Sequence, residues 1–338
     1  MQPHKKIMFS LLAVLVAVLF ALGVGELLLR VTGFEFNLHL SKIEYGWPDP
    51  VTMKQLYYAD QDLLWAPQNY ESVLEQWREK KPAIVFMGCS CTESGKYVAY
   101  FRSIMKEDQT RPPASVINVG VSGWTTYQGL QQLKRDVLAV KPKIITVYYG
   151  WNDHWASFGV EDKDVGRFNR DHPGWLLQLN RLRLVQLFQS VFIRQYKTNT
   201  TELRPPRVSL ADFKSNLRQI TRIAAENGII PVLITAPSSH VKGEEPQYLA
   251  ERGLTNLNEL VSLHQEYVGA VREVASEEGV HLIDLAEEFD KLFQEYPLKR
   301  QLCFKSDGIH ATPAGDKIIA DLIYDYFQRH DFFNQIVQ

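Results

Sequence analysis

The sequence predicts an α/β fold built on a parallel sheet of about five strands, with helices on both faces. Short, continuous apolar runs recur along the chain, amphipathic segments of helical length separate them, and small or polar residues follow the first three runs. Strands covered on both faces have such continuous apolar sequences, and strands that alternate with helices form parallel sheets. Ligands of these sheets bind beyond the carboxyl ends of the strands, so the residues there are candidates for a site.

Five strands and five helices are expected in alternation. The strands are expected at 83–87, 115–119, 143–149, 229–235 and 280–285, and the helices at 96–106, 125–140, 209–227, 257–278 and 312–329. Ser209 is typical of an N-cap residue, and Thr312 before Pro313 combines an N-cap with proline at the first helical position. Gly279 is the expected end of the fourth helix.

The amino terminus carries an uncharged and almost entirely apolar segment, residues 7–25, preceded by Lys5 and Lys6. About 19 residues at a rise of 1.5 Å reach across the roughly 30 Å hydrocarbon core of a bilayer. We therefore expect a transmembrane signal-anchor at 1–30. The flanking lysines predict the amino end in the cytoplasm and the rest of the chain outside it, in a periplasmic or extracellular space.

Two alternatives to the anchor stay open. Ala21-x-Gly23 offers a small-residue cleavage site, and a cleaved signal peptide would leave a secreted protein. A buried core helix would need polar residues on one face, which this segment lacks.

The remaining chain is interpreted as a connector at 31–79 that packs on a globular domain at 80–332. Between about 154 and 206 the alternation of strands and helices breaks down, and aromatic residues are scattered among charged ones. We interpret this stretch as an insertion with some helix around 175–196. Insertions over a strand end often act as lids, but a surface subdomain without a part in binding fits equally well.

Composition excludes several classes of function. The net charge of the 338 residues is −2, so there is no basic footprint for nucleic acid. Three cysteines are too few for a disulfide framework or a cysteine-rich zinc module. Nothing in the sequence has the spacing of metal ligands, and His154 is interpreted as a turn residue. No metal or cofactor is expected.

Four chemically useful pieces fall at strand ends or just before the last helix: Ser90, Gly120, Asn152, and Asp307 with His310. A serine hydroxyl becomes a good nucleophile when a neighbouring base takes its proton, and histidine suits that task near neutral pH. A carboxylate three residues before the histidine can hold one imidazole N–H and stabilise the imidazolium.

Acyl transfer also needs donors for the oxyanion of the tetrahedral intermediate. The backbone N–H groups of Ser90 and Gly120 and the side-chain amide of Asn152 would provide three. Each of these signals is weak alone, because a lone serine after a strand is usually a cap or turn residue. All four in this order, at the ends of successive strands, predict an acyl-transfer site.

These residues carry a resemblance to the SGNH (GDSL-type) hydrolase superfamily over about residues 82–327. Its blocks Gly-Asp-Ser, Asn-x-Gly-x-x-Gly, Gly-x-Asn-Asp and Asp-Gly-x-His match residues 88–90, 118–123, 150–153 and 307–310. The resemblance implies a flavodoxin-like three-layer α/β/α sandwich and hydrolysis of carboxylic esters or removal of O-acetyl groups. It also implies Ser90 as nucleophile, His310 as base and Asp307 as its orienting partner, with Gly120 and Asn152 in the oxyanion hole.

The sequence departs from the family at Cys89, which replaces the aspartate beside the nucleophile. That aspartate is outside the triad, so its loss need not abolish the chemistry. A disulfide between Cys91 and Cys303 is a hypothesis, because their segments should meet near the site in an oxidising compartment. Catalysis by Cys89 or Cys91 in place of Ser90 is disfavoured, because no electropositive setting for a thiolate is recognisable.

The leading hypothesis is a membrane-anchored serine esterase acting on a small-molecule ester or an O-acylated glycan outside the cytoplasm. The second hypothesis keeps the same site but changes the acceptor of the acyl group. It is an O-acyltransferase or deacetylase that works on an envelope polysaccharide. The third, motivated by Cys89, is a non-catalytic binding or assembly protein of the same fold.

Overall fold

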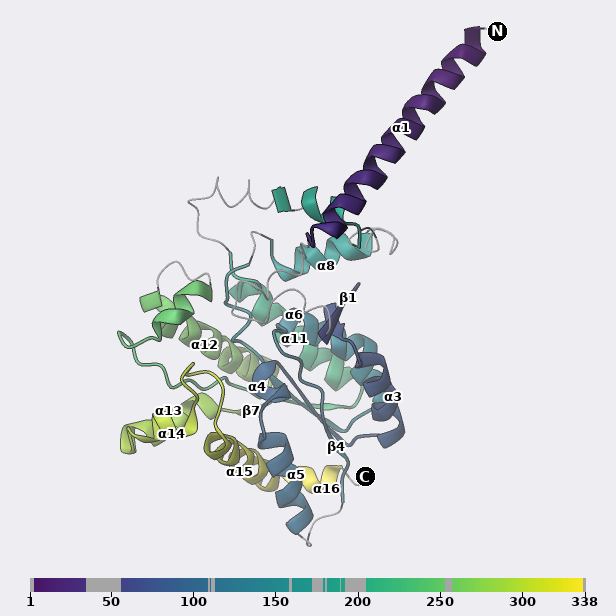
Figure 1. Cartoon of the computed structure of the whole chain (residues 1–338). Helices are drawn as coiled ribbons and strands as arrows, with labels where there is room; N and C mark the ends of the chain where they lie inside the picture. Colours follow the sequence, from purple (N-terminus) through teal and green to yellow (C-terminus); the bar gives the residue numbers. More distant parts are fainter. Residues whose placement is uncertain are drawn as a thin grey trace.

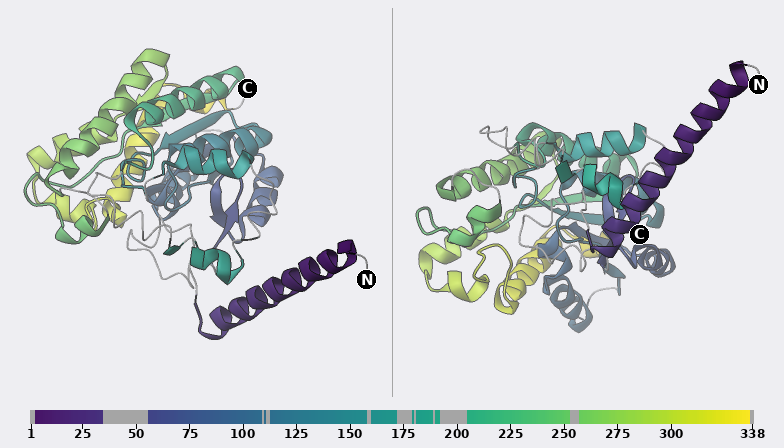
Figure 2. Two further views of the ribbon diagram at one scale, coloured as in Figure 1. Left: turned by 90° about the horizontal axis from the view of Figure 1, so that it is seen from above. Right: turned by 45° about the horizontal axis from the view of Figure 1, so that its top comes forward.

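A computed structural model of the chain describes residues 3–34, 56–108, 110, 113–157, 160–171, 179, 181–188, 190–191, 205–252 and 257–336. Figure 1 shows a long N-terminal helix that stands out from a globular α/β part, and the two further views in Figure 2 show the same arrangement. Residues 35–55 of the expected connector lie outside the described residues.

The globular part is built on one five-stranded sheet in the order β4-β3-β5-β6-β7. Every neighbouring pair is parallel. The strands are β3 (Ile84–Gly88), β4 (Val116–Asn118), β5 (Ile144–Tyr148), β6 (Ile230–Ile234) and β7 (His281–Ile283). All residues of β3 and β5 are buried, which explains why their sequences are apolar without alternation. The predicted parallel sheet is confirmed.

Helices cover both faces of the sheet, as Figure 1 shows. One face carries α5 (Tyr97–Glu107), α15 (Pro313–Arg329) and α16 (Phe332–Gln335), and the other carries α6 (Thr126–Gln132), α11 (Leu210–Glu226) and α12 (Leu260–Glu278). The three-layer α/β/α sandwich that the family resemblance implies is therefore confirmed. Shorter elements are α4 (Ser90–Glu93), α7 (Leu138–Val140), α13 (Leu285–Glu295), α14 (Lys299–Cys303) and the 3-10 turns η3 (Gln247–Arg252) and η4 (Leu257–Glu259).

The helix ends follow the sequence signals. The Ser209 side chain accepts the N–H of Asp212, and the Thr312 side chain accepts the N–H of Gly315. Gly279 ends α12 in the left-handed conformation with φ of 61°. The helix expected at 125–140 is less regular than predicted, because a π-helical turn, η2 (Leu133–Val137), lies between α6 and α7.

The segment expected to be a connector forms more structure than predicted. It contains an antiparallel hairpin, β1 (Tyr57–Asp60) with β2 (Leu64–Pro67), followed by α3 (Tyr70–Lys80). Trp65 and Tyr70 from this segment are buried in the hydrophobic core. The Tyr70 hydroxyl donates to Asp136 at 2.9 Å, which joins α3 to η2. The predicted domain boundary at residue 80 stays a prediction.

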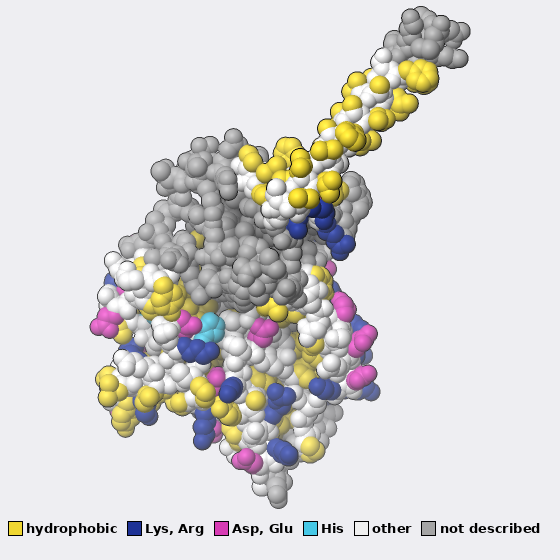
Figure 3. Space-filling view, viewed as in Figure 1, with side chains coloured by type: hydrophobic (Ala, Val, Ile, Leu, Met, Phe, Trp, Pro, Cys, Tyr) yellow, Lys and Arg dark blue, Asp and Glu magenta, His cyan; other side chains and the backbone are white. Residues whose placement is uncertain are grey.

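The N-terminal helix α1 (Pro3–Val31) fits the expected span in length and composition. Its residues Met8–Val31 have a mean hydropathy of 2.6 and none of them is buried, so it is not a core helix of this domain. A membrane anchor and a signal sequence both have these properties. Figure 3 shows its apolar side chains exposed along its length.

The expected insertion contains α8 (Asp162–Asp171) and helical residues at 183–188. Much of the helix expected around 175–196 lies outside the described residues.

Phe101 connects the layers on the α5 face of the sheet. It is fully buried, and its ring centroid lies 5.3 Å from those of Phe86 in β3 and Phe327 in α15. Aromatic pairs in such edge-on contact stabilise a core beyond the apolar area that they bury.

Replacing Phe101 by alanine should lower the free energy of unfolding by about 3–5 kcal/mol, because it leaves a cavity between sheet and helices. Urea unfolding followed by circular dichroism measures this change. The matched control is Leu298→Ala, which removes a side chain that is 79% exposed, and should change stability by less than about 0.5 kcal/mol. Equal effects of the two substitutions would contradict the prediction.

Candidate active site

Ser90 lies just beyond the carboxyl end of the buried strand β3. The strand ends at Gly88, Cys89 is extended, and Ser90 is the first residue of α4. A Cβ on Gly88 would lie 2.0 Å from Thr92 Oγ1, so only glycine lets α4 fold back over the strand end. The first N–H groups of a helix have no partner within it, and the Ser90 N–H makes no hydrogen bond with the described residues.

Asp307 and His310 lie in one turn before α15. Asp307 Oδ1 accepts the backbone N–H groups of Ile309 and His310, both at 2.9 Å. The other carboxylate oxygen, Oδ2, lies 2.6 Å from His310 Nδ1. Gly308 adopts φ of 69°, a conformation that glycine reaches without strain. The turn therefore fixes the carboxylate against one edge of the imidazole.

The opposite edge of the imidazole meets Ser90. His310 Nε2 lies 2.8 Å from Ser90 Oγ, although the two residues are 220 positions apart in sequence. A proton on Nδ1, held by Asp307, leaves Nε2 free to accept the hydroxyl proton. The structure thus brings the three predicted residues together in one hydrogen-bonded line. The side chains of His310 and Asp307 are 21% and 20% exposed, so the line is open to a substrate.

The Asp307 carboxylate is stabilised in its charged form. Burial acts to raise its pKa, but the hydrogen bond and charge of His310 and the N–H groups of Ile309 and His310 outweigh burial and lower the pKa to about 2. A carboxylate with a lowered folded-state pKa contributes stability that is complete above its unfolded pKa of about 4. That contribution is lost as the pH falls towards 2, so Asp307 is ionised across the neutral and mildly acidic range.

Gly120 lies against α4, but its N–H is already engaged. It donates to Asn118 Oδ1 at 2.9 Å, while Asn118 Nδ2 donates to the carbonyl of Thr92 at 2.6 Å. A Cβ on Gly120 would lie 2.7 Å from the backbone nitrogen of Glu93. Glycine is thus needed here for the close approach to α4, whereas the predicted role as an oxyanion donor would require the N–H to leave Asn118.

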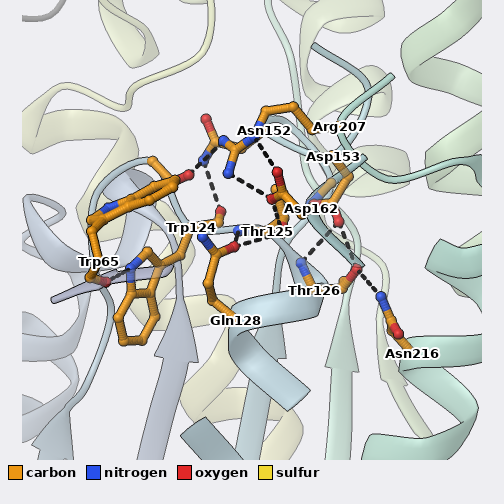
Figure 4. Close-up of polar contacts among 12 residues, drawn as sticks. Trp65, Trp124, Thr125, Thr126, Gln128, Asn152, Asp153, Asp162, Arg207 and Asn216 are labelled. Atoms are coloured by element: carbon orange, nitrogen blue, oxygen red, sulfur yellow. Dashed lines mark hydrogen bonds and ion pairs between the residues drawn. The ribbon is translucent and has the colours of Figure 1, made fainter. Parts of the chain in front are cut away.

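Asn152 lies in the turn after β5 and points to the loop that follows β4. Its Nδ2 donates to the carbonyl of Trp124 at 3.0 Å, and its side chain is largely buried (Figure 4). An amide nitrogen carries two hydrogens, so one is left for a ligand. In the same loop Gly123 adopts φ of 77°, and its N–H makes no hydrogen bond with the described part of the chain.

Arg207, which directly follows the expected insertion, holds this loop, and no sequence motif predicted its role. Its guanidinium is 2% exposed and donates to the carbonyl of Gly123 at 2.7 Å. It also makes two hydrogen bonds with Asp162, of 2.7 and 3.2 Å, and Asp162 in turn accepts the Thr125 hydroxyl at 2.9 Å (Figure 4). The guanidinium carbon lies 5.2 Å from the centre of the Trp65 ring.

Asp153 ties the turn after β5 to the start of α6. Its Oδ1 accepts both the N–H and the hydroxyl of Thr126, at 2.8 and 2.6 Å, and Oδ2 accepts the N–H of Gly150 at 3.1 Å. Burial raises the pKa of Asp153 to about 6, against the hydrogen bonds from Thr126 that lower it. The carboxylate of Asp153 thus accepts two backbone N–H groups and one hydroxyl, which holds the turn that carries Asn152.

The three cysteines are buried free thiols, so no disulfide joins Cys91 and Cys303 in this structure. The Cys91 sulfur instead lies 3.8 Å from the carbonyl oxygen of Ile309. A hydrogen bond with the Cys89 thiol, together with burial, raises the pKa of Cys91 well above its usual value. The imidazole of His310 faces Ser90 rather than either thiol.

His154 lies in the turn region after β5, as expected, and belongs to a buried aromatic group. It is 2% exposed, its Nε2 lies 3.2 Å from His264 Nδ1, and the His264 ring stacks on Trp151 at 3.7 Å. Burial lowers the pKa of His264 to about 3, so this pair is uncharged at neutral pH. No group of three or more potential metal ligands occurs among the described residues.

The fold and the arrangement of the site agree with an ester hydrolase, and a comparison with family models identifies the family. The profile of the GDSL-like Lipase/Acylhydrolase family matches residues 84–318. The chain therefore belongs to this family of ester hydrolases, and the resemblance to the GDSL-type superfamily is confirmed. A comparison with curated protein sequences found no significant match.

Solved structures of similar fold include three esterases or hydrolases. A lipase/acylhydrolase from Enterococcus faecalis has a TM-score of 0.47 and 19% identity, covering 73% of this chain and 95% of that one. The acetylxylan esterase Axe2 from Geobacillus stearothermophilus has a TM-score of 0.47 and 18% identity, covering 75% and 94%. LAE5, an alpha/beta hydrolase from the metagenome of Lake Arreo, has a TM-score of 0.48 and 20% identity, covering 72% and 94%. The family assignment rests on the sequence match, not on these likenesses.

Removing one partner of the Arg207–Asp162 pair should be costly. Arg207→Met leaves a buried carboxylate without its cation and should lower the free energy of unfolding by about 3–5 kcal/mol. The double variant Arg207→Met with Asp162→Leu should be less destabilised than the sum of the two single variants. Denaturant unfolding measures all three. The control is Arg218→Met, which breaks a half-exposed pair with Glu277 and should cost at most about 1 kcal/mol. Strict additivity of the two substitutions would show that the pair is not coupled.

Proposed function

We propose that the chain hydrolyses carboxylic esters or O-acyl groups with Ser90 as nucleophile, His310 as general base and Asp307 as the partner of the imidazole. The observation that carries this proposal is the continuous hydrogen-bonded line from Asp307 Oδ2 through His310 to Ser90 Oγ, with separations of 2.6 and 2.8 Å. The residues come from opposite ends of the domain. The turn at Asp307 does not need a bond to Ser90 to form, so the contact between Ser90 and His310 supports a chemical role.

In the proposed reaction Ser90 Oγ attacks the acyl carbon while His310 Nε2 takes the hydroxyl proton. Asp307, ionised because its pKa lies at about 2, stabilises the imidazolium. The tetrahedral intermediate then collapses, the alcohol leaves with the proton from Nε2, and an acyl-Ser90 ester forms. Water activated by the same imidazole attacks this ester, releases the carboxylic acid and restores the serine.

The oxyanion would be held by the N–H of Ser90 and by the second amide hydrogen of Asn152. The sequence proposal also assigned a donor to Gly120, but that N–H is held by Asn118 at 2.9 Å. We therefore propose the N–H of Gly123 as the third donor and a packing role for Gly120. Gly123 precedes Trp124, whose carbonyl accepts the Asn152 amide at 3.0 Å, so Gly123 is one residue from the contact made by Asn152.

The apolar helix α1 supports a place for this reaction at a membrane. Lys5 and Lys6 precede the span Met8–Val31, which favours the amino end in the cytoplasm. We propose that α1 anchors the chain and that the catalytic domain lies outside the cytoplasm, where its substrate is a small-molecule ester or an O-acylated glycan.

Ser90→Ala and His310→Ala should each abolish turnover of a short-chain aryl ester, because either change interrupts the proton transfer that activates the nucleophile. Ser90→Ala should also abolish covalent labelling by a fluorophosphonate probe, measured by mass spectrometry. Ser262→Ala removes an exposed hydroxyl on α12 and serves as the matched control with unchanged turnover and labelling. Undiminished turnover in the Ser90 variant, with the fold intact by circular dichroism, would end the proposal.

Asn152→Ala should reduce kcat by about 10²–10³ with a much smaller change in KM, because the amide is proposed to act on the oxyanion and not on the bound ester. Steady-state kinetics on the same aryl ester separate the two constants. Asn334→Ala, at an exposed asparagine of α16, is the control and should leave both unchanged. A loss confined to KM would remove Asn152 from the oxyanion hole.

A further inference from the structure

Residues 181–191 of the insertion lie against the C-terminal end of α1. Arg30 Nη2 donates to the carbonyl of Arg181 at 3.1 Å, and the N–H of Leu184 donates to Glu26 Oε2 at 3.0 Å. The Leu184 side chain would lie 3.4 Å from a Cβ placed on Gly25. Two segments more than 150 residues apart in sequence are thus joined where the apolar part of α1 ends.

In this segment apolar side chains are exposed and polar ones are buried, the reverse of the usual pattern on a protein surface. Phe188 and Val191, which are three residues apart, are 73% and 50% exposed. Gln186 and Ser190, which are four residues apart and therefore on one helical face, are buried at 3% and 6% exposure. A helix on a water-soluble surface normally buries its apolar face and exposes its polar one. The outer face of this segment is instead apolar.

The position along α1 indicates what covers that face. Glu26 and Arg30 are the charged residues of the span Met8–Val31, so the polar boundary of a bilayer crossed by α1 would lie along the last turns of this helix. Leu184 contacts α1 at this level, and the apolar side chains of the segment continue from there. In Figure 3 apolar side chains at the base of α1 continue onto the globular part, with basic side chains beneath them.

The charges beside the segment fit the polar boundary of a bilayer. Arg30, Arg181 and Arg183 gather around the contact with α1, and lipid headgroups attract such cations. Apolar side chains on one face with basic residues at their edge are typical of helices that lie in the membrane interface.

We propose that residues 181–188 and 190–191 form a membrane-interfacial element that seats Phe188 and Val191 in the leaflet from which α1 emerges. This inference rests on the proposed anchoring by α1 and adds to it a second contact with lipid. One helix alone would let the domain rotate freely about its connection. Contacts through both α1 and the interfacial element would fix the orientation of the insertion relative to the bilayer. Because Arg207 joins the insertion to the site, the orientation of the site would be fixed as well.

The test uses the full chain in nanodiscs of phosphatidylcholine and phosphatidylglycerol. An environment-sensitive NBD fluorophore is placed by cysteine substitution at one position at a time: Phe188→Cys in the segment, Phe20→Cys in α1 and Leu298→Cys on the opposite part of the domain. Phe20 and Leu298 are matched to Phe188 in exposure, at 73% and 79%. The three native thiols are buried, and ester turnover reports that each labelled protein is folded.

Lipids that carry a spin label near the headgroup end of the acyl chain should quench the probe at residue 188 and shift its emission to the blue. Lipids labelled near the chain end should quench the probe at residue 20, and neither lipid should affect residue 298. A second measurement places the probe at Val191→Cys in a Phe188→Asp background, where quenching should fall towards the value at residue 298.

Each other outcome overturns the inference in a recognisable way. Quenching at residue 20 with none at residue 188 refutes the interfacial element and leaves the anchor standing. No quenching at residue 20 refutes the anchor and the element with it, while the esterase proposal is untouched. A blue shift at residue 188 without quenching by lipid would assign this face to a protein contact instead.

Discussion

The site depends on the single carboxylate of Asp307, which performs two tasks at once. One oxygen closes the turn by accepting two backbone N–H groups, and the other holds the imidazole of His310. The same three hydrogen bonds that order this turn also keep the carboxylate ionised, because each favours the charged form. Folding of the turn and preparation of the base are therefore one event, set by a spacing of three residues.

The proposed nucleophile, Ser90, comes to this turn from a distant part of the sequence. Ser90 is carried by β3, and the parallel sheet brings the end of that strand to the edge where the turn before α15 lies. Glycines at 88 and 120 allow α4 to fit between the strand end and the neighbouring loop at distances that a Cβ would forbid. The sheet thus brings Ser90 to the same edge as the turn of His310, and the close packing of the loops determines its final position.

The features that the sequence predicted are those encoded locally. Continuous apolar runs identified the five strands, and the caps at Ser209 and Thr312 identified helix starts. The hairpin β1–β2 was missed because four-residue strands give too little periodicity. The Arg207–Asp162 pair joins residues 45 positions apart without any local signal. The use of the Gly120 N–H by Asn118 could have been anticipated, because asparagine side chains often bond the backbone two residues on.

Cys89, where the family has aspartate, occupies a buried position beside the proposed nucleophile. Position 89 is 1% exposed and lies near Asp153, whose pKa burial already raises to about 6. A second carboxylate here would add a buried negative charge close to the first, and each would disfavour ionisation of the other. The Cys89 thiol is a small buried group that instead shares a hydrogen bond with the Cys91 thiol. Because the line of Ser90, His310 and Asp307 includes neither thiol, the substitution changes the support of the loop and leaves the reacting groups in place.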